Sequence, residues 1–203
     1  MEIFLVRHGE TGGNLAHRHQ VEDSPLTIAG NEQAKKVATL IKSYEPTVLV
    51  TSPLIRAVET ARAIGQACDL VPKTSPYFIE LRRPQHMYGH YHKSFASFVY
   101  YFQWYLGRMK QSEEMGESYQ ELRQRILEAK KFLEGFKPED RVVVVSHSVF
   151  INLFIAHACQ DTPLTPRQAA QTFTNVLTMP NATVTSLLFD HKAPANTCAW
   201  FKQ

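Results

Sequence analysis

The sequence is poor in cysteine and has no long hydrophobic run. Its 203 residues include only three cysteines, without a CxxC pair, so neither a disulfide framework nor a cysteine zinc site is expected. We therefore expect Cys68, Cys159 and Cys198 to be buried free thiols. No segment approaches the roughly 18 apolar residues that a membrane span requires. The composition is that of an ordinary globular protein, and we expect no membrane partner.

Excess charge of one sign is also lacking. The net charge is +3 and the lysines and arginines are scattered, so we expect no nucleic-acid partner, and anion binding must come from a local pocket. The chain begins Met1-Glu2 and runs directly into a predicted strand, without the basic region and cleavage site of a signal peptide. We therefore expect a cytoplasmic protein.

What the sequence does contain is an alternation of apolar runs and amphipathic segments. The nearly continuous runs at 3–6, 48–50 and 142–145 are typical of strands buried on both faces of a parallel sheet. Helical patterns cover 27–43 and 53–68, and further strands are expected at 183–189 and, at the sheet edge, 197–201. This alternation predicts a three-layer α/β/α sandwich with a mostly parallel central sheet.

Between Tyr77 and Phe136 the alternation stops and two helical patterns follow each other. The first has an aromatic stripe, which we expect to form a core: Tyr91, Phe95, Phe98, Phe102 and Tyr105. The second runs from 119 to 136, packing on the first or on the sheet, and the polar segment 111–118 connects them. We predict a single domain, residues 1–203, with a small helical cap insertion at about 84–118.

Two apolar runs end in histidine. Arg7-His8-Gly9-Glu10-Thr11 follows the first run, and Ser146-His147-Ser148 follows the run at 142–145. Ligands of α/β folds bind where strands open onto loops, so both histidines are expected at one edge of the sheet. Two imidazoles beside an arginine suit an anionic substrate.

Several ordered motifs carry a resemblance to a known family. They are R-H-G-E-T-x-x-N at 7–14, S-P-L-x-R-A-x-E-T-A at 52–61 and V-V-S-H at 144–147, with Pro25-Leu26-Thr27 and Pro180-Asn181 between and after them. Together they resemble the histidine phosphatase superfamily, the phosphoglycerate-mutase-like proteins. The resemblance spans residues 3 to about 189, and only 84–118 lacks a recognisable counterpart.

The resemblance implies that His8 attacks phosphorus and is transiently phosphorylated, and a neutral imidazole is a competent nucleophile. Arg7, Arg56 and His147 would surround the equatorial oxygens, where a transferring phosphoryl group carries its charge. These cations also favour the neutral form of His8. By the same resemblance, Asn14 bonds the phosphoryl group, and Ser148 supplies a backbone N–H where the family usually has glycine.

Glu80 lies where the family places its general acid, and one carboxyl can serve both half-reactions. It is followed by Leu81-Arg82-Arg83-Pro84-Gln85 rather than the family's common G-x-W-E-G. Arg82 and Arg83 are candidates for binding a second anionic group or for an exposed surface. Off the aromatic stripe, some members of a second aromatic set are expected at the pocket mouth, favouring a partly apolar leaving group: Tyr88, Tyr100, Tyr101 and Trp104.

Several other polar residues are expected to have structural rather than catalytic roles. Glu10 and Thr11 are expected to frame the pocket. The clusters His17/His19 and His86/His90/His92 have no carboxylate or cysteine at familiar spacing, so we expect exposed or cap histidines and no metal or other cofactor. The prediction is a metal-independent phosphatase of small phosphate monoesters. The alternatives are a mutase, a non-catalytic phosphate-recognising protein and a histidine-ligated metallohydrolase.

Overall fold

A mixed sheet forms the centre of the molecule. The computed structural model describes residues 1–108, 116–194 and 197–202. Within these ranges one six-stranded sheet has the order β3-β2-β4-β1-β5-β6. The strands are β1 Glu2–Arg7, β2 Val48–Thr51, β3 Lys73–Thr74, β4 Arg141–Ser146, β5 Val184–Phe189 and β6 Trp200–Lys202. The strands β1 to β4 run parallel, and β5 pairs antiparallel with β1 and β6.

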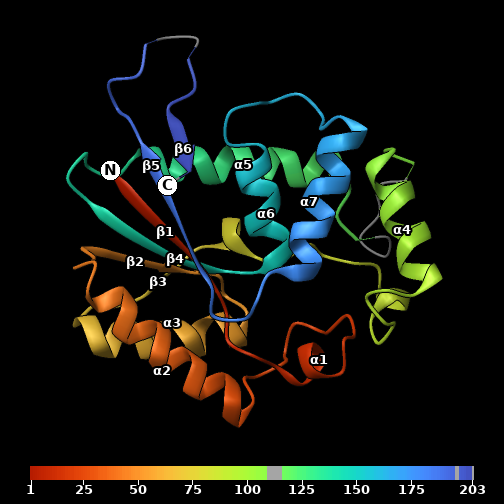
Figure 1. Ribbon diagram of the computed structural model, residues 1–203, viewed down its shortest axis with the longest axis horizontal. Helices are drawn as coiled ribbons and strands as arrows, with labels where there is room; N and C mark the ends of the chain where they lie inside the picture. The colour runs from red at the N-terminus through yellow and green to blue at the C-terminus, as the bar shows by residue number, and fades with distance from the viewer. Residues whose placement is uncertain (109–115, 195–196, 203) are drawn as a thin grey trace.

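Helices cover both faces of this sheet. Figure 1 shows α2 and α3 on one face and α5 and α6 on the other, with α7 between α6 and α4. The helices are α1 Gly12–Leu15, α2 Ile28–Lys42, α3 Ile55–Cys68, α4 Phe95–Tyr105, α5 Tyr119–Glu134, α6 Ser148–Ala156 and α7 Pro166–Thr178, with 3₁₀ turns η1 Pro76–Phe78 and η2 Gln85–Met87. The predicted three-layer sandwich with a mostly parallel sheet is confirmed.

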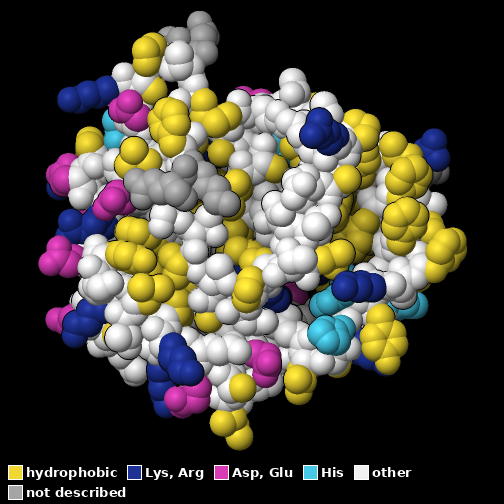
Figure 2. Space-filling view, viewed as in Figure 1, with side chains coloured by type: hydrophobic (Ala, Val, Ile, Leu, Met, Phe, Trp, Pro, Cys, Tyr) yellow, Lys and Arg dark blue, Asp and Glu magenta, His cyan; other side chains and the backbone are white. Residues whose placement is uncertain are grey.

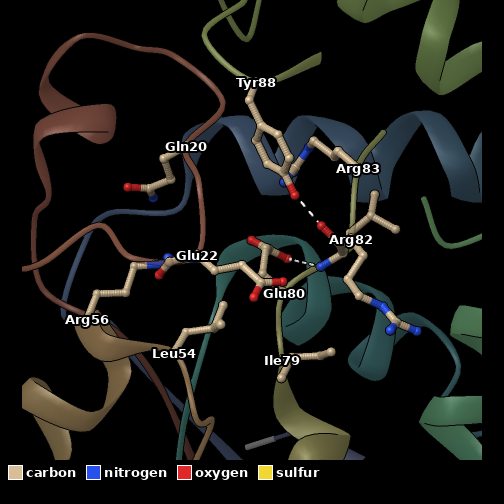
Figure 3. Close-up of a pocket in the computed structure, with 10 residues that line it drawn as sticks. Gln20, Glu22, Leu54, Arg56, Ile79, Glu80, Arg82, Arg83 and Tyr88 are labelled. Atoms are coloured by element: carbon tan, nitrogen blue, oxygen red, sulfur yellow. Dashed lines mark hydrogen bonds between the residues drawn. The ribbon is translucent and has the colours of Figure 1, made fainter. Parts of the chain in front are cut away.

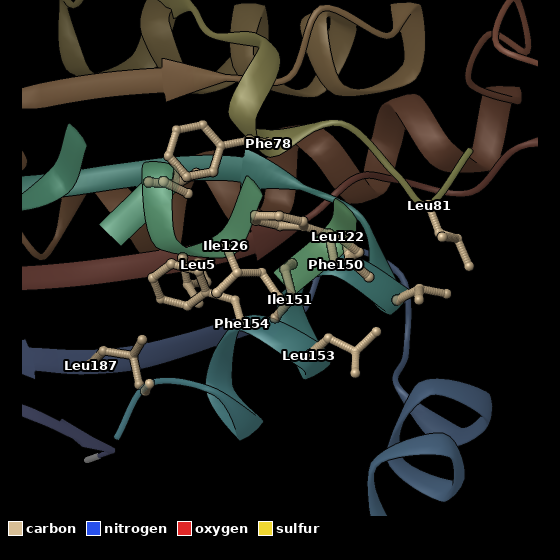
Figure 4. Packing of buried hydrophobic residues seen from close by; sticks show 14 of the residues in the cluster. Leu5, Phe78, Leu81, Leu122, Ile126, Phe150, Ile151, Leu153, Phe154 and Leu187 are labelled. Carbon is tan, nitrogen blue, oxygen red and sulfur yellow. The ribbon is translucent and has the colours of Figure 1, made fainter. Parts of the chain in front are cut away.

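Side chains that alternate along the central strands contribute to two hydrophobic cores, one on each face of the sheet. On β1, Phe4 and Val6 pack in the cluster that includes the inner faces of α2 and α3. Ile3 and Leu5 face the larger cluster with α5 and α6, which contains Phe78, Phe150 and Phe154 (Figure 4). Because successive strand residues point to opposite faces, a continuous apolar run is what a doubly covered strand requires.

Caps fix where the helices begin. The side chain of Thr27 accepts from the backbone N–H of Gly30 and starts α2. Ser118 and Glu121 form a reciprocal capping box at α5. Such caps satisfy N–H groups that have no partner within the helix. None of the helices in the described ranges is long and apolar enough to cross a membrane.

The aromatic stripe of α4 is not a core, so that prediction was wrong. Phe95, Phe98 and Phe102 are 81%, 67% and 52% exposed. The helix instead buries its other face, where the Trp104 indole donates to the carbonyl oxygen of Glu117 at 2.7 Å and its ring packs 4.9 Å from that of Tyr119. A buried indole N–H needs an acceptor, and the Glu117 carbonyl oxygen supplies it.

The structure also shows how the two predicted helices pack. Helix α5 packs on the sheet through Leu122 and Ile126, and its first residue, Tyr119, also contacts Trp104 of α4. Residues 111–115 of the predicted connection lie outside the described residues.

The expectation of three free thiols was wrong as well. Cys159 and Cys198 form a disulfide with a Cα–Cα distance of 5.1 Å, and only Cys68 is a free, half-buried thiol. The pair is 39 residues apart in sequence. Residue 198 comes close to the end of α6 because the chain returns along β5 to form β6. The spacing of the cysteines in the sequence does not indicate this strand pairing.

Candidate active site

The strand-end histidines meet where β1 and β4 lie side by side. The two strands pair in parallel, with Arg7 opposite Ser146, so the residues that follow each strand are neighbours. The ring centroids of His8 and His147 are 5.1 Å apart, and both side chains are buried. The sheet thus brings together two imidazoles from residues far apart in sequence.

The His8 ring has a defined orientation. Its Nδ1 lies 2.6 Å from the carbonyl oxygen of Gly9. A carbonyl only accepts, so Nδ1 carries the hydrogen and Nε2 keeps its lone pair. Burial, and then the guanidinium groups of Arg56 and Arg7, hold the pKa of His8 well below its ordinary value. A buried, neutral imidazole with a free Nε2 lone pair can act as a nucleophile.

The His147 ring is oriented by Ser52. The Ser52 hydroxyl accepts from the backbone N–H of Leu54 at 3.3 Å and lies 2.8 Å from His147 Nε2, to which it can donate its own hydrogen. The remaining ring hydrogen then sits on Nδ1, a buried atom without a hydrogen-bond partner in the described part of the chain. Burial, Arg56 and His8 hold the pKa of His147 well below its ordinary value. His147 is therefore a neutral N–H donor at the site.

Two guanidinium groups supply positive charge, one on the buried Arg56 and the other on the half-buried Arg7. Arg56 is 2% exposed and donates to the carbonyl oxygens of Val21 and Glu22 at 3.3 and 3.2 Å. Arg7 donates to the carbonyl oxygen of Met179. Burial lowers the pKa of Arg56 to about 10, so this group stays cationic at neutral pH. Guanidinium cations beside neutral imidazoles make a site for an anion.

Asn14 and Ser148 add neutral donors. The side-chain oxygen of Asn14 accepts from the backbone N–H of Thr11 at 3.2 Å and from the amide of Asn181 at 2.9 Å, which leaves the Asn14 amide hydrogens for a ligand. Ser148 begins α6, and its hydroxyl donates to the carbonyl oxygen of Val176 at 2.9 Å. Its φ is not positive, so serine needs no special backbone geometry in place of glycine.

Glu80 lies in the same site at the N-terminus of α6. Its carboxylate accepts from the backbone N–H groups of Leu81 at 2.9 Å, Phe150 at 3.2 Å and Val149 at 3.3 Å. Glu80 lines a small pocket together with Arg56 and Glu22 (Figure 3). The end of a helix that offers N–H groups suits a carboxylate.

The two arginines after Glu80 differ. Arg82 is exposed, whereas Arg83 turns inward and donates to the Tyr101 hydroxyl at 2.9 Å and to the Leu81 carbonyl oxygen at 3.3 Å. Arg83 thus lines both the small pocket beside Glu80 and a larger cavity beside His8, whereas Arg82 lines only the small pocket.

The loop after β1 is framed by close backbone contact. A Cβ at Gly30 would lie 2.1 Å from the carbonyl oxygen of Glu10, so only glycine fits there. The Thr27 hydroxyl donates to the Glu10 carboxylate at 2.8 Å, and Thr11 caps α1. These contacts suit the framing predicted for Glu10 and Thr11.

The histidine clusters come together only in part. His17 is exposed, while His19 is buried with its Nε2 2.9 Å from the Ser97 hydroxyl and its ring 4.8 Å from His92. Burial, followed by Arg83, lowers the pKa of His19 to about 2. In the described ranges, no three side chains of His, Cys, Asp or Glu gather to hold a metal ion.

Sequence reasoning gave no role to two residues that organise the site. Ser52 is the first residue of the motif at 52–61, and its position directly before Pro53 is the signal that the sequence offers. Arg125 of α5 pairs with Glu117 at 2.7 Å and donates to the carbonyl oxygens of Tyr77 and Ile79, fixing the segment that leads to Glu80. Nothing in the pattern around Arg125 distinguishes it from a surface arginine.

Fold and site together define an α/β protein with an anion site built on paired strand-end histidines. The sequence pattern of the histidine phosphatase superfamily (branch 1) matches residues 3–198, and the chain belongs to that superfamily. A probable phosphoglycerate mutase, GpmB, of Serratia proteamaculans is 32% identical over 166 residues, which cover 77% of this chain and 74% of the relative. With the Proteus mirabilis protein of that name, identity is 45% over 82 residues, only 40% of this chain and 38% of the relative.

Solved structures share the fold at lower identity. A mycobacterial glucosyl-3-phosphoglycerate phosphatase superposes with a TM-score of 0.76 at 23% identity, covering 100% of this chain and 96% of the other. A protein described as a putative alpha-ribazole-5'-P phosphatase of Escherichia coli gives a TM-score of 0.77 at 22% identity, covering 100% and 94%. The chain therefore belongs to a superfamily with phosphatase and mutase-like neighbours.

Proposed function

We propose that this protein is a metal-independent phosphatase that hydrolyses small phosphate monoesters through a phosphohistidine intermediate on His8. The observation that carries the proposal is the His8 ring, whose Nδ1 is bound to the Gly9 carbonyl oxygen at 2.6 Å and whose Nε2 lone pair is left free. In this proposal the chain acts as one cytoplasmic domain, residues 1–203, with its cap at about 84–118, on a free small molecule.

Binding of the substrate comes first. The guanidinium groups of Arg7 and Arg56, the Nδ1–H of His147 and the Asn14 amide hold the nonbridging oxygens, with the backbone N–H of Ser148 as a further donor. Each group is fixed before substrate arrives by the protein contacts described above. Such preorganised donors stabilise the charge of a transferring phosphoryl group without reorganisation.

Transfer to His8 follows. The Nε2 lone pair attacks phosphorus, a P–N bond forms, and the ester P–O bond breaks with its electron pair on the leaving oxygen. Glu80, in its protonated form, gives a proton to that oxygen, and the alcohol departs. Arg7 and Arg56 favour the neutral His8 before the reaction and the negatively charged phosphoryl group on it afterwards.

Water completes the cycle. Glu80, now a carboxylate, takes a proton from water as the water oxygen attacks phosphorus. The P–N bond breaks, its electron pair returns to Nε2, and inorganic phosphate leaves. One carboxyl therefore serves as acid and then as base.

The test is phosphate release from a panel of monoesters, including an aromatic one, with excess chelator present. Wild type should turn over with chelator, and His8→Ala should not. His86→Ala, which removes an exposed histidine that lines neither the small pocket nor the cavity beside His8, is the matched control and should keep wild-type rates. Loss of activity on chelation would support the metallohydrolase, and absence of turnover by wild type would support a phosphate-recognising protein.

Mutase activity is the second candidate, since the Serratia proteamaculans relative carries the name of a probable phosphoglycerate mutase. A mutase returns the phosphoryl group to a second hydroxyl of the substrate, whereas a phosphatase gives it to water. Incubation with phosphoglycerate isomers distinguishes the two, because a mutase interconverts the isomers faster than it releases phosphate.

A further inference from the structure

A cavity far larger than a phosphoryl group adjoins His8. It lies between α4 and α7 and has a volume of about 1150 Å³. Pockets that accept drug-sized ligands span roughly 300–1,000 Å³. We call this space the α4–α7 cavity. Its size exceeds what the small esters of a generic phosphatase require.

The two ends of the α4–α7 cavity differ in chemistry. One end contains Arg7, His8, Asn14 and Arg56, the proposed phosphoryl site. The other end is apolar and is formed by α4 and α7: Phe98, Phe102, Tyr105, Phe173, Val176 and Leu177. A single continuous space thus offers cations at one end and hydrocarbon at the other.

The apolar end is accessible to a ligand. Phe98, Phe102 and Leu177 are 67%, 52% and 51% exposed, which is costly for side chains of this size. Figure 2 shows hydrophobic side chains gathered over α4 at the right of the view. Exposed apolar groups gathered in this way mark binding surfaces. These apolar side chains line the same cavity as His8. We therefore infer that the apolar end holds the rest of a substrate whose phosphate group reaches His8.

We propose that the preferred substrates are phosphate monoesters of amphiphiles, in which a long alkyl or extended aromatic group lies in the α4–α7 cavity. This proposal rests on the proposed function and specifies its substrate class. The leaving alcohol is then an apolar one. Tyr101 links the two ends, because its hydroxyl accepts from Arg83 Nε at 2.9 Å and its ring centroid lies 5.2 Å from that of Phe173.

Binding of alkylphosphonates tests the ligand class without depending on turnover. Methyl-, butyl- and octylphosphonate carry the same anionic head, resist hydrolysis and are used below micelle-forming concentrations. Titration calorimetry on the full chain should show the dissociation constant falling about two- to fourfold for each added methylene that is buried. An affinity independent of chain length would overturn the proposal.

Variants of α4 locate the effect. Phe98→Ala should reduce the octyl-to-methyl affinity ratio about tenfold, because it removes an apolar wall of the cavity. Phe95→Ala is the matched control, since Phe95 is an equally large side chain on the same helix, 81% exposed, and does not line the cavity. Equal effects of the two variants would contradict the assignment.

Failure of the function and failure of the inference are distinguishable. If wild type hydrolyses esters with rates and affinities that do not depend on chain length, the amphiphile substrate class is refuted and the phosphatase activity stands. If affinity rises with chain length but no ester is hydrolysed, the amphiphile ligand class stands and the phosphatase activity is refuted. Concentration-dependent dimerisation in sedimentation that Phe95→Ala abolishes would assign the aromatic face of α4 to a second copy of this chain, and would overturn the proposal.

Discussion

The Ser52 hydroxyl determines which nitrogen of His147 carries hydrogen, and Ser52→Ala tests this. The variant removes the partner 2.8 Å from His147 Nε2 on a ring that is 0% exposed. A buried acceptor left without its partner costs about 1–3 kcal/mol. We expect the free energy of unfolding, measured in urea, to fall by that amount. Binding of inorganic phosphate should weaken too, because Nδ1 is no longer fixed as a donor.

Ser75→Ala is the matched control. Ser75 is also a buried serine, 4% exposed, but its hydroxyl has no hydrogen-bond partner among the described residues. Removing it should change the unfolding free energy by less than about 0.5 kcal/mol. If Ser52→Ala unfolds at the same urea concentration as Ser75→Ala and binds phosphate like wild type, the assigned role of Ser52 is wrong.

Three further predictions concern charge and packing. The pKa values of His8 and His147 lie well below their ordinary value in the fold, so the unfolded chain takes up protons first as pH falls. Stability is then present above about pH 6.5 and lost below it, by up to about 1.4 kcal/mol per pH unit for each ring. Urea titrations at several pH values measure this slope, and an equal slope in His8→Asn would contradict it. Arg125→Met leaves the 1%-exposed Glu117 carboxylate unpaired and should lower the free energy of unfolding by about 3–5 kcal/mol. Adding Glu117→Gln should restore part of that stability. Unchanged thermal unfolding of Arg125→Met would refute the role of the ion pair. Gly30→Ala places a Cβ 2.1 Å from a carbonyl oxygen and should cost about 1–3 kcal/mol with weakened phosphate binding, whereas wild-type affinity would show that the loop adapts.

The central sheet could be predicted because its physics is local. A strand covered on both faces needs apolar residues at every position, and the run at 142–145 has them, all 0% exposed. The meeting of His8 and His147 followed from parallel strands that end at one edge. The resemblance supplied the residues of the site and their proposed roles.

The environment of α4 could not be predicted, because helical periodicity shows that an aromatic stripe exists but not which surface it contacts. Two faces of α4 are rich in aromatic residues, and the contact of Trp104 with Glu117 and Tyr119 determines which face is buried. The Cys159–Cys198 disulfide likewise depends on how β6 returns along β5. Both are long-range contacts, for which neither composition nor spacing carries a signal.

The proposed mechanism requires His8 to carry the phosphoryl group, and trapping the intermediate shows whether it does. Wild type is mixed with an aromatic phosphate monoester, quenched in alkaline denaturant and digested, and its peptides are weighed by mass spectrometry. We expect one added phosphoryl group on the peptide that contains His8 and none in His8→Ala. Steady turnover by wild type with an unmodified His8 peptide, or turnover retained by His8→Ala, would contradict it.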